Sequence, residues 1–258
     1  MSALRGSGQR ILAYSFYDDP HTSDTLNRNF FKGIKENLDG IREQYNSKNS
    51  GLESTFNFTP HQNICEIPRS NKLFPMLWRF LPVQDQEVEV LFSRDLDSRI
   101  TPREIHAVRE FMSTNKSIHA MRDHMQHGTE ILGGMWGARL GILHLRMLIE
   151  NALYRLLRDP VALKPRTERG HDQVLLTKYM WWGFALDSVP LMSKLGLTHD
   201  SYHCRRYPGS QAFPSKRPIG VLNFVGAVAD MNNTIHSTEG NKCPKECRPK
   251  NHQDWEFC

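Results

Sequence analysis

The sequence predicts an α/β fold in which one domain contains a mostly parallel sheet flanked by helices. Three observations support this prediction. Residues 87–99, EVEVLFSRDLDSR, form a buried-strand pattern that runs into two aspartates. A helix start follows at Thr101, and residues 117–121 then provide a second strand. Strand, helix and strand in this order are typical of a βαβ unit, whose two strands run parallel.

The helix after the aspartates has a well-marked start. Thr101 can cap the first turn, Pro102 suits the first helical position, and Glu104 completes a capping box. Apolar residues then recur along one face, and the helical pattern stops at 114–116. We therefore expect a helix that begins at Pro102.

Apolar periodicity predicts the other elements. We expect a strand at 10–16, helices at 31–45, 138–158 and 173–184, and either a short helix or a pocket wall at 73–82. Residues 46–69 and the region from Ser193 onward predict loops, with at most one short strand at 63–67. No repeat or clear linker divides the chain, so we expect one α/β domain over 1–230 and a cysteine-containing tail over 231–258.

Composition limits the classes of function. The chain has 258 residues, of which 39% are hydrophobic, and a formal net charge of +5. No apolar run approaches the roughly 20 residues that a membrane helix needs, so we expect no transmembrane segment in this chain. Lysine and arginine are scattered, and neither a zinc-finger spacing nor a basic helix is present. We therefore expect no nucleic-acid partner.

The five cysteines bear on the compartment. Cys65 stands alone, whereas Cys204, Cys243, Cys247 and Cys258 lie in the last quarter. A disulfide-tied tail explains this clustering better than a zinc site with His252, whose spacing matches no standard motif. Sequons at Asn57, Asn115 and Asn232 are compatible with a secretory compartment.

Two locations stay open. Residues 1–9 lack the apolar segment of a signal peptide. Either the protein is cytoplasmic with free cysteines, or a targeting segment lies outside this chain and the protein belongs to the secretory pathway, in the Golgi or outside the cell. The tail favours the second location.

Asp95 and Asp97 are the strongest candidates for a metal site. They follow a strand, and ligands in α/β sheets bind beyond the carboxyl ends of strands. If the strand continues, alternate residues share a face and both carboxylates can point the same way. Hard oxygen ligands suit Mg²⁺ or Mn²⁺. Arg94 and Arg99 could pair with these carboxylates or reach a diphosphate. A salt-bridged turn before the helix explains the same residues equally well.

A second polar cluster follows the second predicted strand. Arg122, Asp123, His124 and His127 are concentrated in one turn, in which Arg122 and Asp123 are candidates to bind a cofactor or donor. Gly133–Gly134 lets backbone approach such a ligand closely. The two histidines, three residues apart, could act as acid–base groups or metal ligands. The alternative is a surface turn and a helix start, with Trp136 in the core.

Two later segments could complete the site. Asp172, at a helix start, is either a first-turn residue or a general base toward an acceptor hydroxyl. His199 or His203 could be the third ligand of a metal held by the aspartates, or could belong to a basic surface loop.

Taken in order, these segments resemble a poorly characterised group of glycosyltransferase-like proteins of bacteria and invertebrate animals. The resemblance covers about residues 73–217. The matching motifs are W-R-F at 78–80, S-R-D-L-D-S-R at 93–99, R-E-x-x-A-V at 103–108, H-x-M-R-D-H-x-x-H at 119–127, G-G-M-W-G at 133–137, H-D-Q at 171–173 and H-D-S-Y-x-C at 199–204.

The resemblance implies a nucleotide-diphospho-sugar transferase fold of the GT-A type. By that resemblance Asp95, Asp97 and either His199 or His203 bind Mn²⁺ or Mg²⁺, and Asp172 is the base. The partners would be a nucleotide-sugar donor and a glycan, protein or lipid acceptor. Two features depart from the group: Met125 replaces a proline, and 46–71 is shorter.

Two other functions remain open. One is a metal-dependent phosphoesterase or nuclease that uses the aspartate pair with His124 and His127. The other is a truncated, non-catalytic binding protein of the same fold, which the short stretch at 46–71 suggests.

Overall fold

The fold is seen in a computed structural model of the chain. The described residues are 6–15, 32–41, 73–124, 127–163, 170–181, 185–186, 189–190, 198–202, 210–217, 224–228, 245 and 248–256. All five cysteines lie outside these residues, and so does the predicted disulfide pairing in the tail. So does the predicted loop at 46–69 with its short strand.

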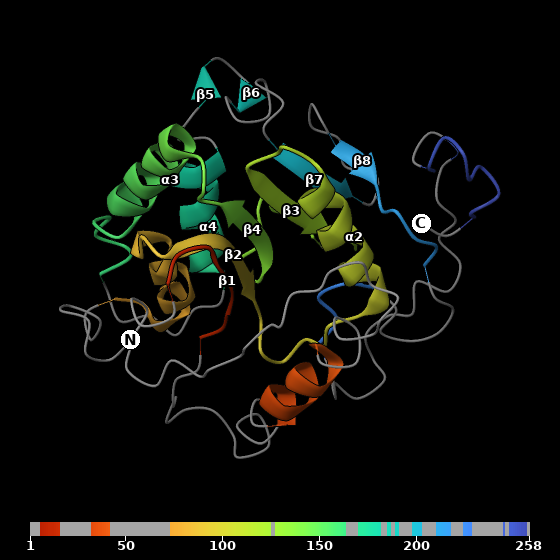
Figure 1. Ribbon diagram of the computed structural model, residues 1–258, viewed down its shortest axis with the longest axis horizontal. Helices are drawn as coiled ribbons and strands as arrows, with labels where there is room; N and C mark the ends of the chain where they lie inside the picture. The colour runs from red at the N-terminus through yellow and green to blue at the C-terminus, as the bar shows by residue number, and fades with distance from the viewer. Residues whose placement is uncertain are drawn as a thin grey trace.

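A six-stranded mixed sheet forms the centre of the molecule (Figure 1). Its strands, in spatial order, are β1 (Gln9–Ala13), β2 (Val88–Arg94), β4 (Met135–Arg139), β3 (Ile118–Arg122), β7 (Thr198–Tyr202) and β8 (Ser210–Ala212). A separate pair consists of β5 (Ala185–Leu186) and β6 (Val189–Pro190). The single α/β domain is confirmed. The sheet is mixed: three of its five neighbouring strand pairs are parallel, and β4 runs antiparallel to both of its neighbours.

The strand β4 corrects the predicted helix at 138–158. Residues Met135–Arg139 pair on both sides, and the helix α3 begins only at Leu143 and ends at Leu156. Gly137 sits opposite Phe92, and a Cβ atom added there would lie 2.5 Å from the Phe92 ring. The close strand pairing therefore requires a glycine, whose presence weakens the local strand signal.

The antiparallel strand sets the direction of the βαβ unit. Since β4 is antiparallel to both β2 and β3, those two strands point the same way, as predicted, although they are not neighbours. Their carboxyl ends, Arg94 and Arg122, therefore lie at one edge of the sheet together with the beginning of β4. We call this the carboxyl edge.

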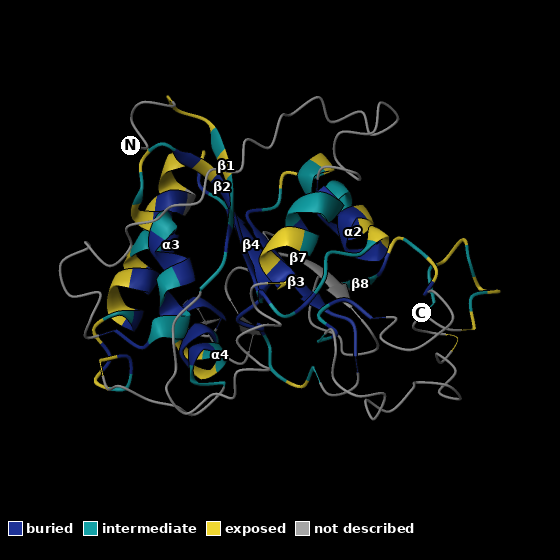
Figure 2. Ribbon diagram, turned by 90° about the horizontal axis from the view of Figure 1, so that it is seen from below, coloured by how far each residue is buried: buried dark blue, intermediate teal, exposed yellow. Residues whose placement is uncertain are grey.

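Helices cover both faces of the sheet (Figure 2). The helix α2 (Pro102–Ser113) lies on one face. On the other are α3 and α4 (His171–Leu176). The 3₁₀ helix η4 (Pro75–Gln84) packs against α3. The largest core cluster joins the second group to the sheet and includes Leu77, Phe80, Trp136, Ile149, Leu153 and Leu176. A smaller one joins Phe92 to Val108 and Phe111 of α2.

The observed bounds of the other elements show where local sequence patterns were sufficient to predict the structure. A helix spans residues 32–41, within the predicted 31–45, and the 73–82 segment is helical. The predicted helix at 173–184 is α4 followed by a π-helical turn, Thr177–Trp181. The loop predicted from Ser193 onward is wrong at β7 and β8, whose polar sequences gain order by pairing, β7 with β3 and β8 with β7.

Within the described ranges, none of the helices is both long and apolar enough to span a bilayer.

The cap of α2 gives a test of local stability. Thr101 Oγ1 accepts a hydrogen bond from the Glu104 backbone N–H at 3.2 Å, as predicted. We expect Thr101→Ala to lower the free energy of unfolding by about 1 kcal/mol, because one helix N–H loses its partner. Urea denaturation measures this loss. Thr101→Ser keeps the acceptor and should lie within about 0.5 kcal/mol of the wild type; an equal loss in both variants would contradict the capping role.

Candidate functional site

The carboxyl edge brings together segments that are far apart in the sequence. Asp95 and Asp97 lie in the turn after β2, and Asp123 and His124 follow β3. The Gly133–Gly134 pair leads into β4. The turn after β2 is closed by a 3.4 Å hydrogen bond from the Ser98 N–H to the Asp95 carbonyl. Strand alternation therefore stops at Arg94 and does not orient the two aspartates.

Arg79 joins Asp95 to Asp172. Its Nη1 atom pairs with Asp95 Oδ1, and its Nη2 atom donates to Asp172 Oδ2 at 2.6 Å. The exposed fractions of the side chains are 4% for Arg79, 38% for Asp95 and 0% for Asp172. Asp172 thus meets Asp95 as part of one charged cluster. No role for Arg79 was predicted from the sequence, although a lone charge inside the apolar segment LFPMLWRFLP was a usable signal.

Two glycines enclose this cluster. A Cβ atom added at Gly134 would lie 2.2 Å from the Asp95 carboxylate. One added at Gly133 would lie 1.9 Å from Asp172 Oδ2 and 2.6 Å from Arg79 Nη2. Side chains at either position would therefore displace the charged groups. The Gly133–Gly134 backbone was predicted to approach a ligand closely. In the described residues it closely approaches the carboxylates of Asp172 and Asp95.

The two carboxylates differ in their affinity for protons. Burial favours the neutral acid at Asp95, but the Arg79 guanidinium outweighs it and holds the pKa of Asp95 below its usual value. Burial raises the pKa of Asp172, and the charge of Asp95 adds to this rise, although Arg79 opposes it. Neighbouring acids with opposite shifts are typical of sites that need one ionised group and one proton acceptor.

The helix at residues 32–41 braces the aspartate turn. Asn37 Nδ2 donates to the Leu96 carbonyl at 3.4 Å and to the Ser98 carbonyl at 3.0 Å, and Asn37 Oδ1 accepts from the Ile100 N–H at 3.1 Å. Gly33 packs so closely that an added Cβ atom would lie 2.2 Å from the Leu96 oxygen. The turn that carries Asp95 and Asp97 is therefore fixed by contacts that local sequence did not reveal.

Arg94 holds the same turn from inside. Its Nε atom lies 2.8 Å from Glu104 Oε1, and its Nη atoms donate to the Gly134 carbonyl at 3.1 Å and to Ser98 Oγ at 3.2 Å. Arg99 pairs with Glu36 and donates to the Leu96 carbonyl. Both arginines predicted to reach a diphosphate are thus engaged with the protein. Their contact with a ligand stays a prediction.

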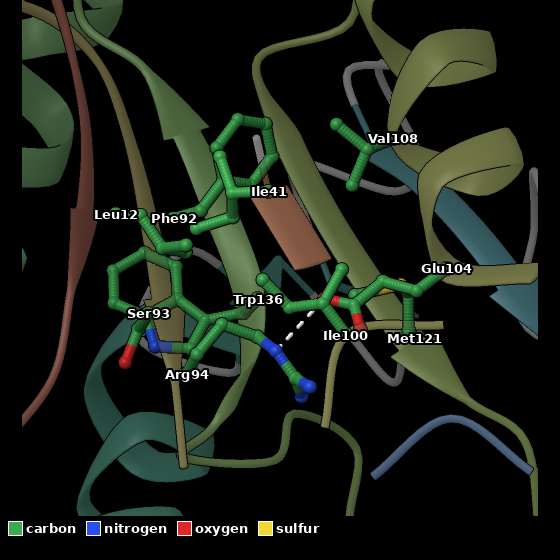
Figure 3. A pocket seen from close by; sticks show the side chains of 10 residues that line it. All are labelled: Leu12, Ile41, Phe92, Ser93, Arg94, Ile100, Glu104, Val108, Met121 and Trp136. Carbon is green, nitrogen blue, oxygen red and sulfur yellow. Dashed lines mark ion pairs between the residues drawn. The ribbon is translucent and has the colours of Figure 1, made fainter. Parts of the chain in front are cut away.

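A small cavity lies beside the Arg94–Glu104 pair, between the sheet and α2 (Figure 3). The two charged side chains point toward each other among apolar groups that include Phe92, Val108 and Trp136. Its volume of about 20 Å³ has room for about one water molecule. The residues that line the cavity do not include Asp95.

Asp123 ties three parts of the chain together. It is fully buried and pairs with Arg103 through two bonds of 2.9 Å and with Arg217 at 2.7 Å. It also accepts from the Val225 N–H at 2.8 Å. All of these bonds are made to other residues of the protein. The Asp123 carboxylate, which was predicted to bind a ligand, therefore holds the segments that contain Arg217 and Val225 against the carboxyl edge.

The neighbours of Asp123 face inward too. Arg122 is buried and donates to the Glu130 carbonyl at 2.8 Å. His124 stacks on Phe224 with ring centres 4.3 Å apart, and His127 Nδ1 accepts from the Asp123 N–H at 3.0 Å. This packing does not favour a phosphoesterase site built on the two histidines. Burial first, and then the charge of Arg217, lower the pKa of His124.

The predicted third metal ligand is placed only by the backbone. In β7, His199 pairs with His119, three residues before the end of β3. That is about 10 Å from the carboxyl edge at the rise of a strand. His203 follows Tyr202, the last residue of β7, in the sequence. It lies outside the described residues, and the three-ligand site stays a prediction.

The described donors fit a divalent cation in part. Among the residues the structure describes, no group of three or more His, Cys, Asp or Glu side chains could hold a metal ion. Asp95 is ionised and keeps an exposed face, and Asp97, two residues later, is half-buried. These are two hard oxygen donors of the kind that Mg²⁺ and Mn²⁺ prefer.

His127 predicts a pH-dependent stability. Burial, together with His124 and Arg217, lowers its pKa to about 4 in the fold, against about 6.5 unfolded. The unfolded chain therefore binds the proton first, and the stabilisation present above pH 6.5 is lost as the pH falls toward 4. Between pH 7 and pH 5 we expect a loss of about 2 kcal/mol. Urea denaturation should show a smaller loss in His127→Asn; an unchanged pH dependence would contradict this assignment.

The Asp123 network predicts a large structural effect. Asp123→Asn would leave Arg103 and Arg217 buried without a counter-charge, so we expect a loss of about 3–5 kcal/mol in the free energy of unfolding. Chemical denaturation measures it. Asp254→Asn, at an exposed position, is the matched control and should change stability by less than about 0.5 kcal/mol. Equal stabilities of the two variants would argue against a structural role for Asp123.

Comparison with protein families, curated proteins and solved structures finds no match to this chain.

Proposed function

We propose that the chain is a metal-dependent glycosyltransferase, which moves a sugar from a nucleotide-sugar donor to an acceptor hydroxyl on a glycan, protein or lipid. One observation supports this more than any other. Asp95 and Asp172, 77 residues apart, share Arg79 at the carboxyl edge, and their pKa values are shifted in opposite directions. Such an edge is where α/β sheets bind ligands.

In this proposal each carboxylate has its own task. Asp95 and Asp97 hold Mn²⁺ or Mg²⁺, with His203 as the preferred third ligand. The metal, when bound, would neutralise charge on the departing diphosphate. Asp172 accepts the proton of the acceptor hydroxyl, and its raised pKa moves it in the direction that a general base requires near neutral pH.

The braced turn supports the proposal physically. A cation site needs carboxylates whose positions do not change on binding. Asn37 holds the backbone on both sides of Asp97, and Arg94 ties the same turn to Gly134. The aspartates are therefore presented by a fixed backbone rather than by an unsupported loop. A secretory location and a disulfide-tied tail remain separate predictions.

Calorimetry with UDP and GDP, each with and without Mn²⁺, tests the function. We expect nucleotide binding that depends on the metal, and we expect Asp97→Asn to weaken it by at least roughly a hundredfold, because a charged ligand is lost. Asp254→Asn removes an equal charge at an exposed site and should bind as the wild type does.

Other results would point elsewhere. Absence of nucleotide binding under every metal condition would contradict the transferase and leave the non-catalytic binding protein. Metal-dependent hydrolysis of a simple phosphate ester, without nucleotide-sugar binding, would support the phosphoesterase instead.

A further inference from the structure

We propose that Arg79 is an internal counter-ion that competes with the divalent cation for Asp95 and so sets the metal affinity of the site. This inference rests on the proposed function, since it concerns the cation that Asp95 and Asp97 would hold. It assigns a role to a residue that is neither a metal ligand nor the base.

The geometry of Arg79 is that of a shared counter-ion. Its Nη1 atom contacts Asp95 Oδ1 and also donates to the Arg94 carbonyl at 3.3 Å, while Nη2 bonds Asp172 at 2.6 Å. The guanidinium is 4% exposed and reaches Asp95 from the buried side. A cation can reach the same carboxylate only from its exposed side. Both positive charges would then act on one carboxylate.

The positive charge cannot easily move away. Gly133 lies so close that an added Cβ atom would be 2.6 Å from Arg79 Nη2, and the neighbouring residue, Phe80, is fully buried in the core. Solvent screens a buried charge much less than a surface charge. The positive charge of Arg79 therefore repels the cation at close range, whether Arg79 pairs more closely with Asp95 or with Asp172.

Asp172 makes this competition reversible. When a cation binds Asp95, Arg79 shares that carboxylate with the cation and keeps Asp172 as its second acidic partner, so the guanidinium is never left buried without a counter-charge. A single-partner arginine would have no such alternative. The arrangement thus allows Asp95 to pair either with the Arg79 guanidinium alone or also with the divalent cation.

The test measures Mn²⁺ affinity directly, by calorimetry and by the electron-spin signal of free Mn²⁺, without nucleotide. Arg79→Gln keeps an amide donor toward Asp95 and removes the charge, so we expect binding that is tighter by at least roughly tenfold. Arg79→Lys keeps the charge and should stay within roughly threefold of the wild type. Arg158→Gln removes an equal charge from an exposed position on the α3 side and should have no effect.

The opposite result is just as distinct. If Arg79 instead orients Asp95 for the metal, both Arg79 variants lose affinity, because neither glutamine nor lysine can bridge the two aspartates. Unchanged or weaker binding by Arg79→Gln overturns the proposal. Circular dichroism and thermal unfolding without metal check that the variants fold. If Arg79→Gln does not fold, Arg79→Lys decides: near-wild-type affinity supports competition, and a tenfold loss overturns it.

The two proposals can fail separately. A wild type that binds Mn²⁺, with no gain in Arg79→Gln, overturns only the counter-ion role. Mn²⁺ binding that tightens in Arg79→Gln while no nucleotide binds to either protein overturns only the transferase. Failure of both proteins to bind Mn²⁺ overturns both.

Discussion

Pairing of buried charge at the carboxyl edge is the constraint on which the rest of the structure depends. Arg79, Arg94 and Arg103 are each almost fully buried, and each meets a carboxylate: Asp95 with Asp172, Glu104, and Asp123. An unpaired charge at such depth costs several kcal/mol, so no partner can be absent without a large loss of stability. The η4 helix, the strand ends and α2 are therefore fixed relative to one another by electrostatics as well as by apolar packing.

The fold was predictable where the signal was local. The cap at Thr101, the strand up to Arg94 and the apolar face of α2 follow from residues a few positions apart. Strands β4 and β7 were missed because their order comes from neighbours distant in sequence. In β4 (MWGAR), only the nearby Phe92 ring explains why Gly137 is a glycine. The polar sequence of β7 (THDSY) is stabilised as a strand only by pairing with its neighbours.

The residue types of the candidate site could be predicted from the sequence, but the directions in which their side chains point were less predictable. Asp95 and Asp172 were identified from motifs, and they do share a cluster. Arg94 stands in the same motif as Asp95, and Asp123 stands in the motif at 119–127. Both point into the protein, because a sequence does not distinguish a charge that meets a ligand from one that meets an internal partner. Arg79 was missed since its role depends on two carboxylates, 16 and 93 residues away.

The bonds of Asp123 have a consequence for how the protein is made. Arg217 and Val225 follow Asp123 by 94 and 102 residues. On the ribosome, Asp123 and Arg103 are therefore translated long before the groups that complete their network. Until those groups emerge, the nascent carboxyl edge keeps a half-satisfied charge, which favours solvent over the interior. The edge that carries the candidate site can close only late in synthesis, when the bonding of distant segments replaces water.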